Sequence, residues 1–217
     1  MYELPLFPLN TVLFPGISLR LQVFEPRYRI MILDCLDTRT HFGVVLIRKG
    51  METFDPSVEP YRVGCTAQMM QVEKVDEERI NIRTIGIERF RILSIDRTSK
   101  PYLSGIVEPH PLISQDRLEI VQKAGVLSEW VQRYLKILKE SGVDHYHIDQ
   151  APYEPIKFAY LAAALLRIPL KKKQDILAIK QAADLVEDLC VIYRHELAIL
   201  KALLSNGFES VGTFSKN

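Results

Sequence analysis

Cysteine, long hydrophobic runs and excess charge of either sign are all scarce in this sequence of 217 residues. Every apolar run falls short of the roughly 20 residues that span a bilayer, so we expect no membrane segment. The N-terminal residues Met1–Pro15 carry neither a basic leader nor a small-residue cleavage site, which argues against a signal peptide. The three cysteines, Cys35, Cys65 and Cys190, form a poor disulfide framework and indicate a reducing compartment. The cytoplasm is therefore the expected location.

The charges nearly cancel, because 28 Lys and Arg residues stand against 27 Asp and Glu residues. The resulting net charge of +1 creates no overall field toward nucleic acid or an anionic membrane. Hydrophobic residues make up 47% of the chain, which is typical of a globular protein.

The first half of the chain has the period of β structure. Apolar and polar residues alternate over Ile17–Val23, which predicts a half-buried strand, and the apolar run Val44–Ile47 predicts a fully buried one. A further strand is expected over Tyr102–Glu108. Pro26 favours the start of a short helix over residues 27–36. The side chains expected on one side of this helix are Ile30, Leu33 and Leu36.

Two longer strands, over residues 65–75 and 80–93, change the parity of their apolar positions. The first switches between Met69 and Met70; the second switches between residues 82 and 85 and again between 87 and 90. A strand cannot change parity without turning its apolar side outward, so each switch predicts a bulge or bend. Joined by a polar turn at Asp76–Arg79, these strands predict a curled sheet or barrel.

From Ser114 onward the period is helical. A first helix is expected from a cap at Ser114 to a stop at Gly142, with one stripe of apolar residues. A second, apolar nearly all round and therefore buried, follows Pro155, and a third helical segment extends to residue 204. The predicted division is a β-rich lobe over residues 1–112, a helical bundle over 113–205 and a mobile tail over 206–217. The expected stripes are Leu118, Val121, Ala124, Leu127, Val131, Leu135 and Leu138, and later Ala183, Val186, Cys190, Tyr193, Leu197, Leu200 and Leu204.

Several short motifs occur in the order found in the N-terminal substrate-binding domain of Lon proteases. The opening Leu4–Gly16 and the following Leu19–Arg29 resemble the start of that domain. Taken together, motifs in this order are specific, and the resemblance covers residues 3–205. The further segments that resemble the family are Phe42–Ile47, Tyr61–Ala67, Ile85–Ile92 and Ile168–Leu177.

The resemblance implies an α+β fold, with a PUA-like β pseudo-barrel followed by a helical bundle, and a role in grasping proteins or peptides. A ubiquitin-ligase substrate receptor shares this domain, so binding without proteolysis occurs in the family. One departure concerns Lys171 and Lys172, where related sequences often carry acidic residues. Lysines at a helix start oppose the helix dipole, so the surface at this point differs from that of the related sequences.

The sequence lacks the motifs of the catalytic parts of a Lon protease. No Gly-x-x-x-x-Gly-Lys-Ser/Thr phosphate loop is present, and the family's serine–lysine dyad belongs to a separate C-terminal domain. We therefore expect a stand-alone, non-catalytic module with no cofactor. A cysteine hydrolase is the disfavoured alternative, because Cys65 and Cys190 lie on apolar faces and His41, His110 and His195 are isolated from obvious nucleophiles.

The segment Asp144–Asp149 contains two histidines, His145 and His147, flanked by carboxylates. On a strand the two imidazoles would point the same way, as a metal site requires. The spacing of third and fourth ligands is not diagnostic, so we expect a solvated loop and no metal.

The link from the first long strand to the first helix supplies the candidate peptide-binding residues Phe24, Glu25, Arg27 and Tyr28. Aromatic residues and arginine dominate binding hot spots, so these side chains could line a peptide groove. In the structural alternative, Phe24 fastens the strand end to the helix and Glu25 pairs with an arginine.

The leading hypothesis is an adaptor in proteolysis that binds unfolded or exposed apolar polypeptide segments, through a cleft between the lobes or an open strand edge. A regulator that competes with authentic Lon for substrates is also open. The alternative is an RNA-binding PUA-like module. It is disfavoured because Arg79, Arg83, Arg89 and Arg91 are mixed with Glu77, Glu78 and Glu88.

Overall fold

The computed structural model describes residues 1–51, 57–140 and 152–212, with side chains up to residue 204. These residues form two compact units. The first comprises Met1–Ile113 and Arg167–Lys180, and the second comprises Ser114–Leu166 and Gln181–Asn217. The units differ from the predicted division at residue 112 in one segment, because residues 167–180 group with the strands.

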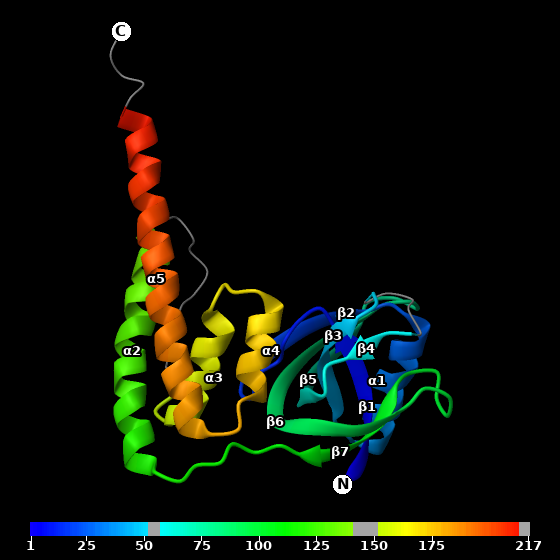
Figure 1. Ribbon diagram of the computed structural model, residues 1–217. Helices are drawn as coiled ribbons and strands as arrows, with labels where there is room; N and C mark the ends of the chain where they lie inside the picture. Colours follow the sequence, from blue (N-terminus) through cyan, green and yellow to red (C-terminus); the bar gives the residue numbers. More distant parts are fainter. Residues whose placement is uncertain (52–56, 141–151, 213–217) are drawn as a thin grey trace. The chain divides into compact units, whose positions relative to one another are not determined.

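The first unit is a closed barrel (Figure 1). Strand β1 pairs antiparallel with β7 through Tyr2–Pro5 and parallel with β3 through Leu6–Leu9. The ring then closes through β3, β5, β6 and β7, while β2 and β4 lengthen it as partners of β6 and β3. The curled sheet and the α+β class are thus confirmed. The elements of this unit are β1 (Tyr2–Leu9), β2 (Ser18–Val23), α1 (Pro26–Thr38), β3 (Phe42–Lys49), β4 (Glu59–Pro60), β5 (Val63–Lys74), β6 (Ile80–Asp96), β7 (Ser104–Pro109) and α4 (Leu170–Ala178).

Two of the three predicted bulges are present. The register between β5 and β6 shifts between Met69 and Gln71 and again between Gly86 and Arg89. The switch expected between residues 82 and 85 is wrong, because the inward row continues through Thr84, which is fully buried. Its hydroxyl donates to the carbonyl of Leu19 at 3.2 Å, so a polar residue occupies an inward position that apolar parity cannot reveal.

The helix α1 buries a different face from the one predicted. Ile30, Leu33 and Leu36 are 43%, 50% and 38% exposed. Two contacts set the rotation of the helix: the Tyr28 ring stacks on Phe7, with centroids 4.3 Å apart, and Asp34 accepts a 2.7 Å hydrogen bond from the Tyr102 hydroxyl. The buried face consists of Tyr28, Met31, Ile32 and Cys35.

A buried arginine joins α4 to the barrel and accounts for the grouping of residues 167–180 with the strands. Arg89 is 3% exposed, and its Nη1 donates to the carbonyl oxygens of Leu177 and Ile179 at 2.6 and 2.5 Å. The Gln174 amide donates to the Val63 carbonyl at 3.0 Å. The carbonyl groups at the C-terminal end of a helix have no partner within the helix, and here Arg89 supplies one. Together with the Gln174 bond, these contacts hold the short helix α4 against the strands.

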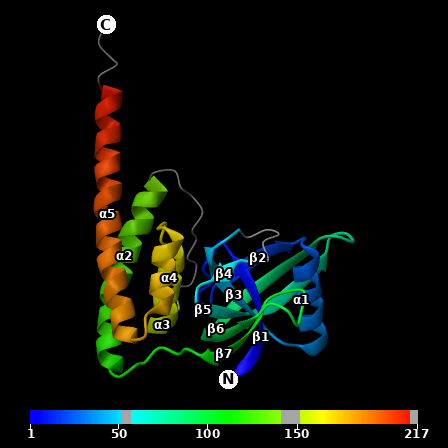
Figure 2. The same cartoon turned by 45° about the vertical axis from the view of Figure 1, so that its right-hand side comes forward.

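The second unit consists of α2 (Arg117–Glu140), α3 (Pro155–Leu165) and α5 (Ala182–Gly212). The three helices pack side by side (Figure 2). The Tyr193 hydroxyl donates to the Ala162 carbonyl at 2.7 Å, and the Tyr193 ring meets Tyr134 edge-on. The predicted burial of α3 is confirmed.

Several predicted details of this unit are wrong. Asp116, not Ser114, caps α2, because its carboxylate accepts from the amides of Leu118 and Glu119 at 2.9 and 3.0 Å. With the helix starting at this cap, Leu118 and Val121 lie on its exposed side. Helix α5 continues to Gly212, so residues 206–212 of the predicted tail are helical; Gly142 and residues 213–217 lie outside the described residues. The buried residues of α2 are Ile120, Ala124, Leu127, Val131, Tyr134 and Leu138.

Candidate functional site

The barrel wall has a seam between β1 and β2. Strand β2 pairs with β6 along one edge, and no described strand pairs with its other edge. Along β1, the pairing with β7 covers Tyr2–Pro5, and Leu6 donates to the carbonyl of Leu103; beyond Leu6, the described strands supply no further partner on that edge. The second half of β1 and the outer edge of β2 therefore border an unpaired stretch of the wall.

A small pocket of about 190 Å³ lies at this seam. Its walls come from β1, from β2 and from the start of α1, and four of its residues belong to the main core cluster of the barrel. Because core side chains are fixed by packing, the pocket is preformed. It is smaller than the 300–1,000 Å³ or so that is typical of small-molecule sites, so it fits a single side chain. The lining residues are Phe7, Leu9, Leu21, Gln22, Val23, Phe24, Glu25 and Tyr28.

The four residues predicted to bind peptide lie beside this pocket in different roles. Phe24 is 48% exposed, whereas Tyr28 is buried under the Phe7 ring. The Glu25 carboxylate is buried and accepts from Nε of Arg27 at 2.9 Å, and the Arg27 guanidinium covers the Tyr28 ring at 4.6 Å from its centroid. Of the four, Phe24 is the most exposed, and the other three are fixed by contacts within the chain.

Sequence reasoning missed the contribution of β1. Phe7 and Leu9 line the pocket, but the run of prolines and apolar residues around them has no clear period. The alternation in Ile17–Val23 did place Leu21 and Val23 on the inward side, where the pocket lies. The pairing of Glu25 with an arginine, expected under the structural alternative, is confirmed.

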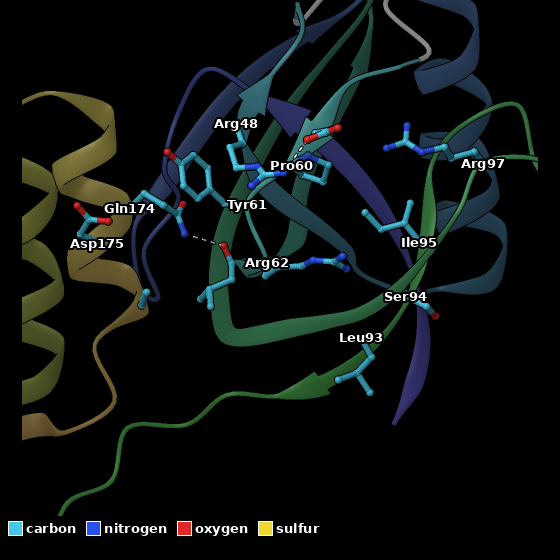
Figure 3. Close-up of a pocket in the computed structure, with 13 residues that line it drawn as sticks. Arg48, Pro60, Tyr61, Arg62, Leu93, Ser94, Ile95, Arg97, Gln174 and Asp175 are labelled. Atoms are coloured by element: carbon cyan, nitrogen blue, oxygen red, sulfur yellow. Dashed lines mark hydrogen bonds and ion pairs between the residues drawn. The ribbon is translucent and has the colours of Figure 1, made fainter.

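A wider hollow in the first unit, of about 940 Å³, lies between β4, β5, β6 and α4 (Figure 3). Three arginines line it, but two are already engaged. Arg48 pairs with Glu59 at 2.6 Å, and Arg97 donates to the carbonyl of Val58 at 2.8 Å. Gln174 lies at its α4 side, bonded to the Val63 carbonyl. Because one of these arginines is ion-paired and another is bonded to a carbonyl oxygen, this hollow is a weaker candidate than the seam.

The cysteine thiols are poorly suited to nucleophilic chemistry. Burial raises the pKa of Cys65 to about 12 and raises the pKa of both Cys35 and Cys190 above their usual value. A thiol with a raised pKa holds little thiolate at neutral pH, and the thiolate is the reactive form. Burial also lowers the pKa of His110, which lies beside the cationic Arg89.

Among the residues that the structure describes, no group of three or more His, Cys, Asp or Glu side chains is placed to hold a metal ion. The candidate segment Asp144–Asp149 lies outside these residues. Likewise, no helix within the described part of the chain is both long and apolar enough to cross a membrane.

Comparison with known proteins identifies the family. The family model for the ATP-dependent protease La (LON) substrate-binding domain matches residues 3–194. The Lon protease of Anaeromyxobacter dehalogenans (strain 2CP-C) is 27% identical over 98% of this chain, and Lon protease 2 of Myxococcus xanthus is 25% identical over 98%. The chain spans about a quarter of the length of these relatives, 25% and 26% respectively.

Two solved structures of Lon N-terminal domains are similar to this chain. The Lon N-terminal domain protein from Xanthomonas campestris is 26% identical, with a TM-score of 0.63 over 88% of this chain and 98% of that one. The N-terminal domain of the Lon protease of the Mycobacterium avium complex shares the fold, with a TM-score of 0.65 at 12% identity over 89% of this chain and 98% of that one. The chain belongs to the LON substrate-binding domain family.

Proposed function

We propose that this chain is a non-catalytic recognition module that binds extended, apolar polypeptide segments at the seam between β1 and β2. The observation that carries the proposal is the coincidence of an unpaired strand edge with a preformed apolar pocket. Either feature alone is common on protein surfaces, but an extended peptide uses both. Backbone hydrogen bonds to an edge supply affinity, and pockets for alternate side chains supply specificity.

The outer edge of β2 has hydrogen bonds to offer. In an antiparallel pair, alternate residues turn their N–H and C=O groups away from the partner strand. Over Ser18–Val23, paired with β6 residues 80–85, half of the backbone groups therefore point toward the seam. An added segment would continue the sheet at this point.

Phe24 supplies the apolar contact at the end of that edge. Phe24 is about half exposed and lines the same pocket as Tyr28, whose ring is held by the Phe7 stack and by the Arg27 guanidinium. A rigid aromatic next to a pocket is the usual anchor of a binding hot spot. A large apolar side chain of the ligand would enter the pocket and cover the exposed half of Phe24.

The proposed role is that of an adaptor or regulator in proteolysis, which includes competition with Lon proteases for substrates. The family supports substrate recognition, and burial raises the pKa of Cys35, Cys65 and Cys190, which disfavours a cysteine nucleophile. Location in the cytoplasm stays a prediction from the cysteine content.

The RNA-binding alternative loses most of its expected arginines. Arg89 is buried against α4, and Arg79 and Arg91 are paired with Asp76 and Glu108. An RNA surface needs a stripe of available cations with interleaved aromatics. Arg83 lines an exposed hollow, but a single arginine does not make such a stripe.

Fluorescence anisotropy with labelled unfolded casein and with a short Phe-rich peptide tests the proposal. The Phe24→Ala variant should weaken binding by roughly 10-fold or more, as expected for a hot-spot residue. Leu118→Ala, which removes an exposed apolar side chain of the second unit, is the control and should leave affinity unchanged. Absence of binding at high micromolar protein, or equal loss in both variants, would contradict the proposal.

A further inference from the structure

Two arginines face each other directly on the outer surface of the barrel. In the register between β2 and β6, Arg20 lies opposite Arg83. Side chains directly opposite on neighbouring strands have Cβ atoms about 4.5–5.5 Å apart, and like charges in that position are destabilising. Within the described residues, neither guanidinium takes part in an ion pair. The fold thus keeps two like charges opposite each other, neither of them in an ion pair with a described carboxylate.

The pair lines a hollow of about 630 Å³ that is otherwise rich in amide side chains. Gln71 of β5 lies opposite Arg83 of β6. Gln22 of β2 lies opposite Asn81 of β6, and their side-chain amides are 3.4 Å apart. Amides and guanidinium groups together present many hydrogen-bond donors. Guanidinium forks match carboxylate and phosphoryl oxygens, with which they form the strongest hydrogen bonds in proteins.

Glu73 limits the charge that the hollow can accept. It is the single carboxylate among the lining residues, so two cations and one anion leave one net positive charge. The neighbouring hairpin turn adds Glu77 and Glu78. A polyanion would meet these carboxylates, whereas one isolated oxyanion would not.

The hollow adjoins the seam pocket, because Leu21 and Gln22 line both. We propose that this hollow binds a carboxylate or phosphoryl group on the same polypeptide segment that enters the seam pocket; the inference rests on the proposed function. The ligand would then be a segment with one large apolar residue and one acidic or phosphorylated residue close by.

Strand geometry sets the spacing of those two residues. The pocket lies on the inward side of β2, with Leu21 and Val23, and Arg20 points to the outward side. Successive side chains of a strand alternate between faces at about 3.3 Å per residue. In a ligand strand beside β2, the apolar and anionic residues must therefore be an odd number of positions apart. Arg20 and Val23, which lines the pocket from the inward side, are three residues apart along β2. That separation is roughly 10 Å, so a spacing of three positions in the ligand matches it and a spacing of one does not.

The experiment measures anisotropy of labelled peptides with the full chain. One peptide carries Phe with Glu three positions later; its partners carry Gln at that position, Glu moved to the fourth position, or phosphoserine in place of Glu. The Gln and shifted-Glu peptides should bind about 10-fold more weakly, as expected for loss of a charge-assisted hydrogen bond. A phosphoserine peptide tighter than the Glu peptide assigns the anion to a phosphoryl group, and a weaker one assigns it to a carboxylate; both support the site.

Variants separate this site from the fold. Arg83→Gln should abolish the preference for Glu over Gln without lowering the melting temperature, because it also removes a like-charge pair. Arg117→Gln, an exposed arginine of the second unit, is the control and should keep the preference. Equal binding of the Glu and Gln peptides would overturn the anion site alone. If the unaltered chain bound none of the peptides, the proposed function would be contradicted as well. A preference for single-stranded RNA over every peptide would overturn both the anion site and the proposed function.

Discussion

Replacement of Arg89 tests whether the link between β6 and α4 stabilises the first unit. Arg89→Met keeps much of the side-chain volume but removes both hydrogen bonds to the carbonyls of Leu177 and Ile179. Hydrogen bonds from a charged donor contribute about 1.5–3 kcal/mol each. Water recovers part of that loss at a helix end, so we expect α4 to lose about 3 kcal/mol of protection, a large part of the 5–15 kcal/mol that stabilises a domain.

Hydrogen–deuterium exchange measured by mass spectrometry reports the loss of protection in α4 separately from the rest of the chain. Amides of residues 170–178 should exchange on the order of 100-fold faster in Arg89→Met, since each 1.4 kcal/mol corresponds to a factor of 10. Urea unfolding followed by circular dichroism should show a lower midpoint. Arg89→Lys should recover only part of the loss, because a single ammonium lacks the planar fork.

Arg91, two residues further along β6, provides the matched control. It is half exposed and pairs with Glu108, and exposed pairs contribute about 0–1 kcal/mol. Arg91→Met should therefore leave exchange in α4 unchanged. If Arg89→Met and Arg91→Met behaved alike, the buried guanidinium would not be what holds the helix.

Three further predictions concern titration, thiol access and backbone packing. Burial lowers the pKa of His110 in the folded state. Its contribution to stability should therefore be fully present above the unfolded pKa of about 6.5 and be lost as the pH falls through the folded pKa. In urea titrations from pH 7 to 5, His110→Gln should reduce this dependence of stability on pH. Cys65, with its pKa near 12, should resist iodoacetamide in the native state at pH 8 and react after denaturation; rapid native labelling would contradict its burial. Gly86→Ala places a Cβ 2.3 Å from a backbone oxygen of the loop before β2 and should cost about 1–3 kcal/mol in thermal unfolding. At Gly125 an added Cβ would meet no atom within 4 Å apart from the local backbone of its own helix, so Gly125→Ala should instead stabilise α2 by about 0.5–1 kcal/mol. A loss of stability there would refute the packing argument.

Local patterns in the sequence determined the type of most elements. Alternation over Ile17–Val23 predicted β2, and the parity change at Met69 and Met70 predicted a bulge that the β5 register shows. Pro155 marked the start of α3. These features depend on residues near one another in the chain, so one sequence suffices to read them.

Only the tertiary structure decided which of two possible faces an element buries and which distant residues meet. The rotation of α1 depends on contacts of Tyr28 with Phe7 and of Asp34 with Tyr102, and the inward position of Arg89 depends on carbonyls some 90 residues later. The seam at β1 and the opposition of Arg20 and Arg83 follow from barrel closure and register. Periodicity constrains a residue relative to its own element, but it contains no information on the pairing of elements, and the candidate sites arise from that pairing.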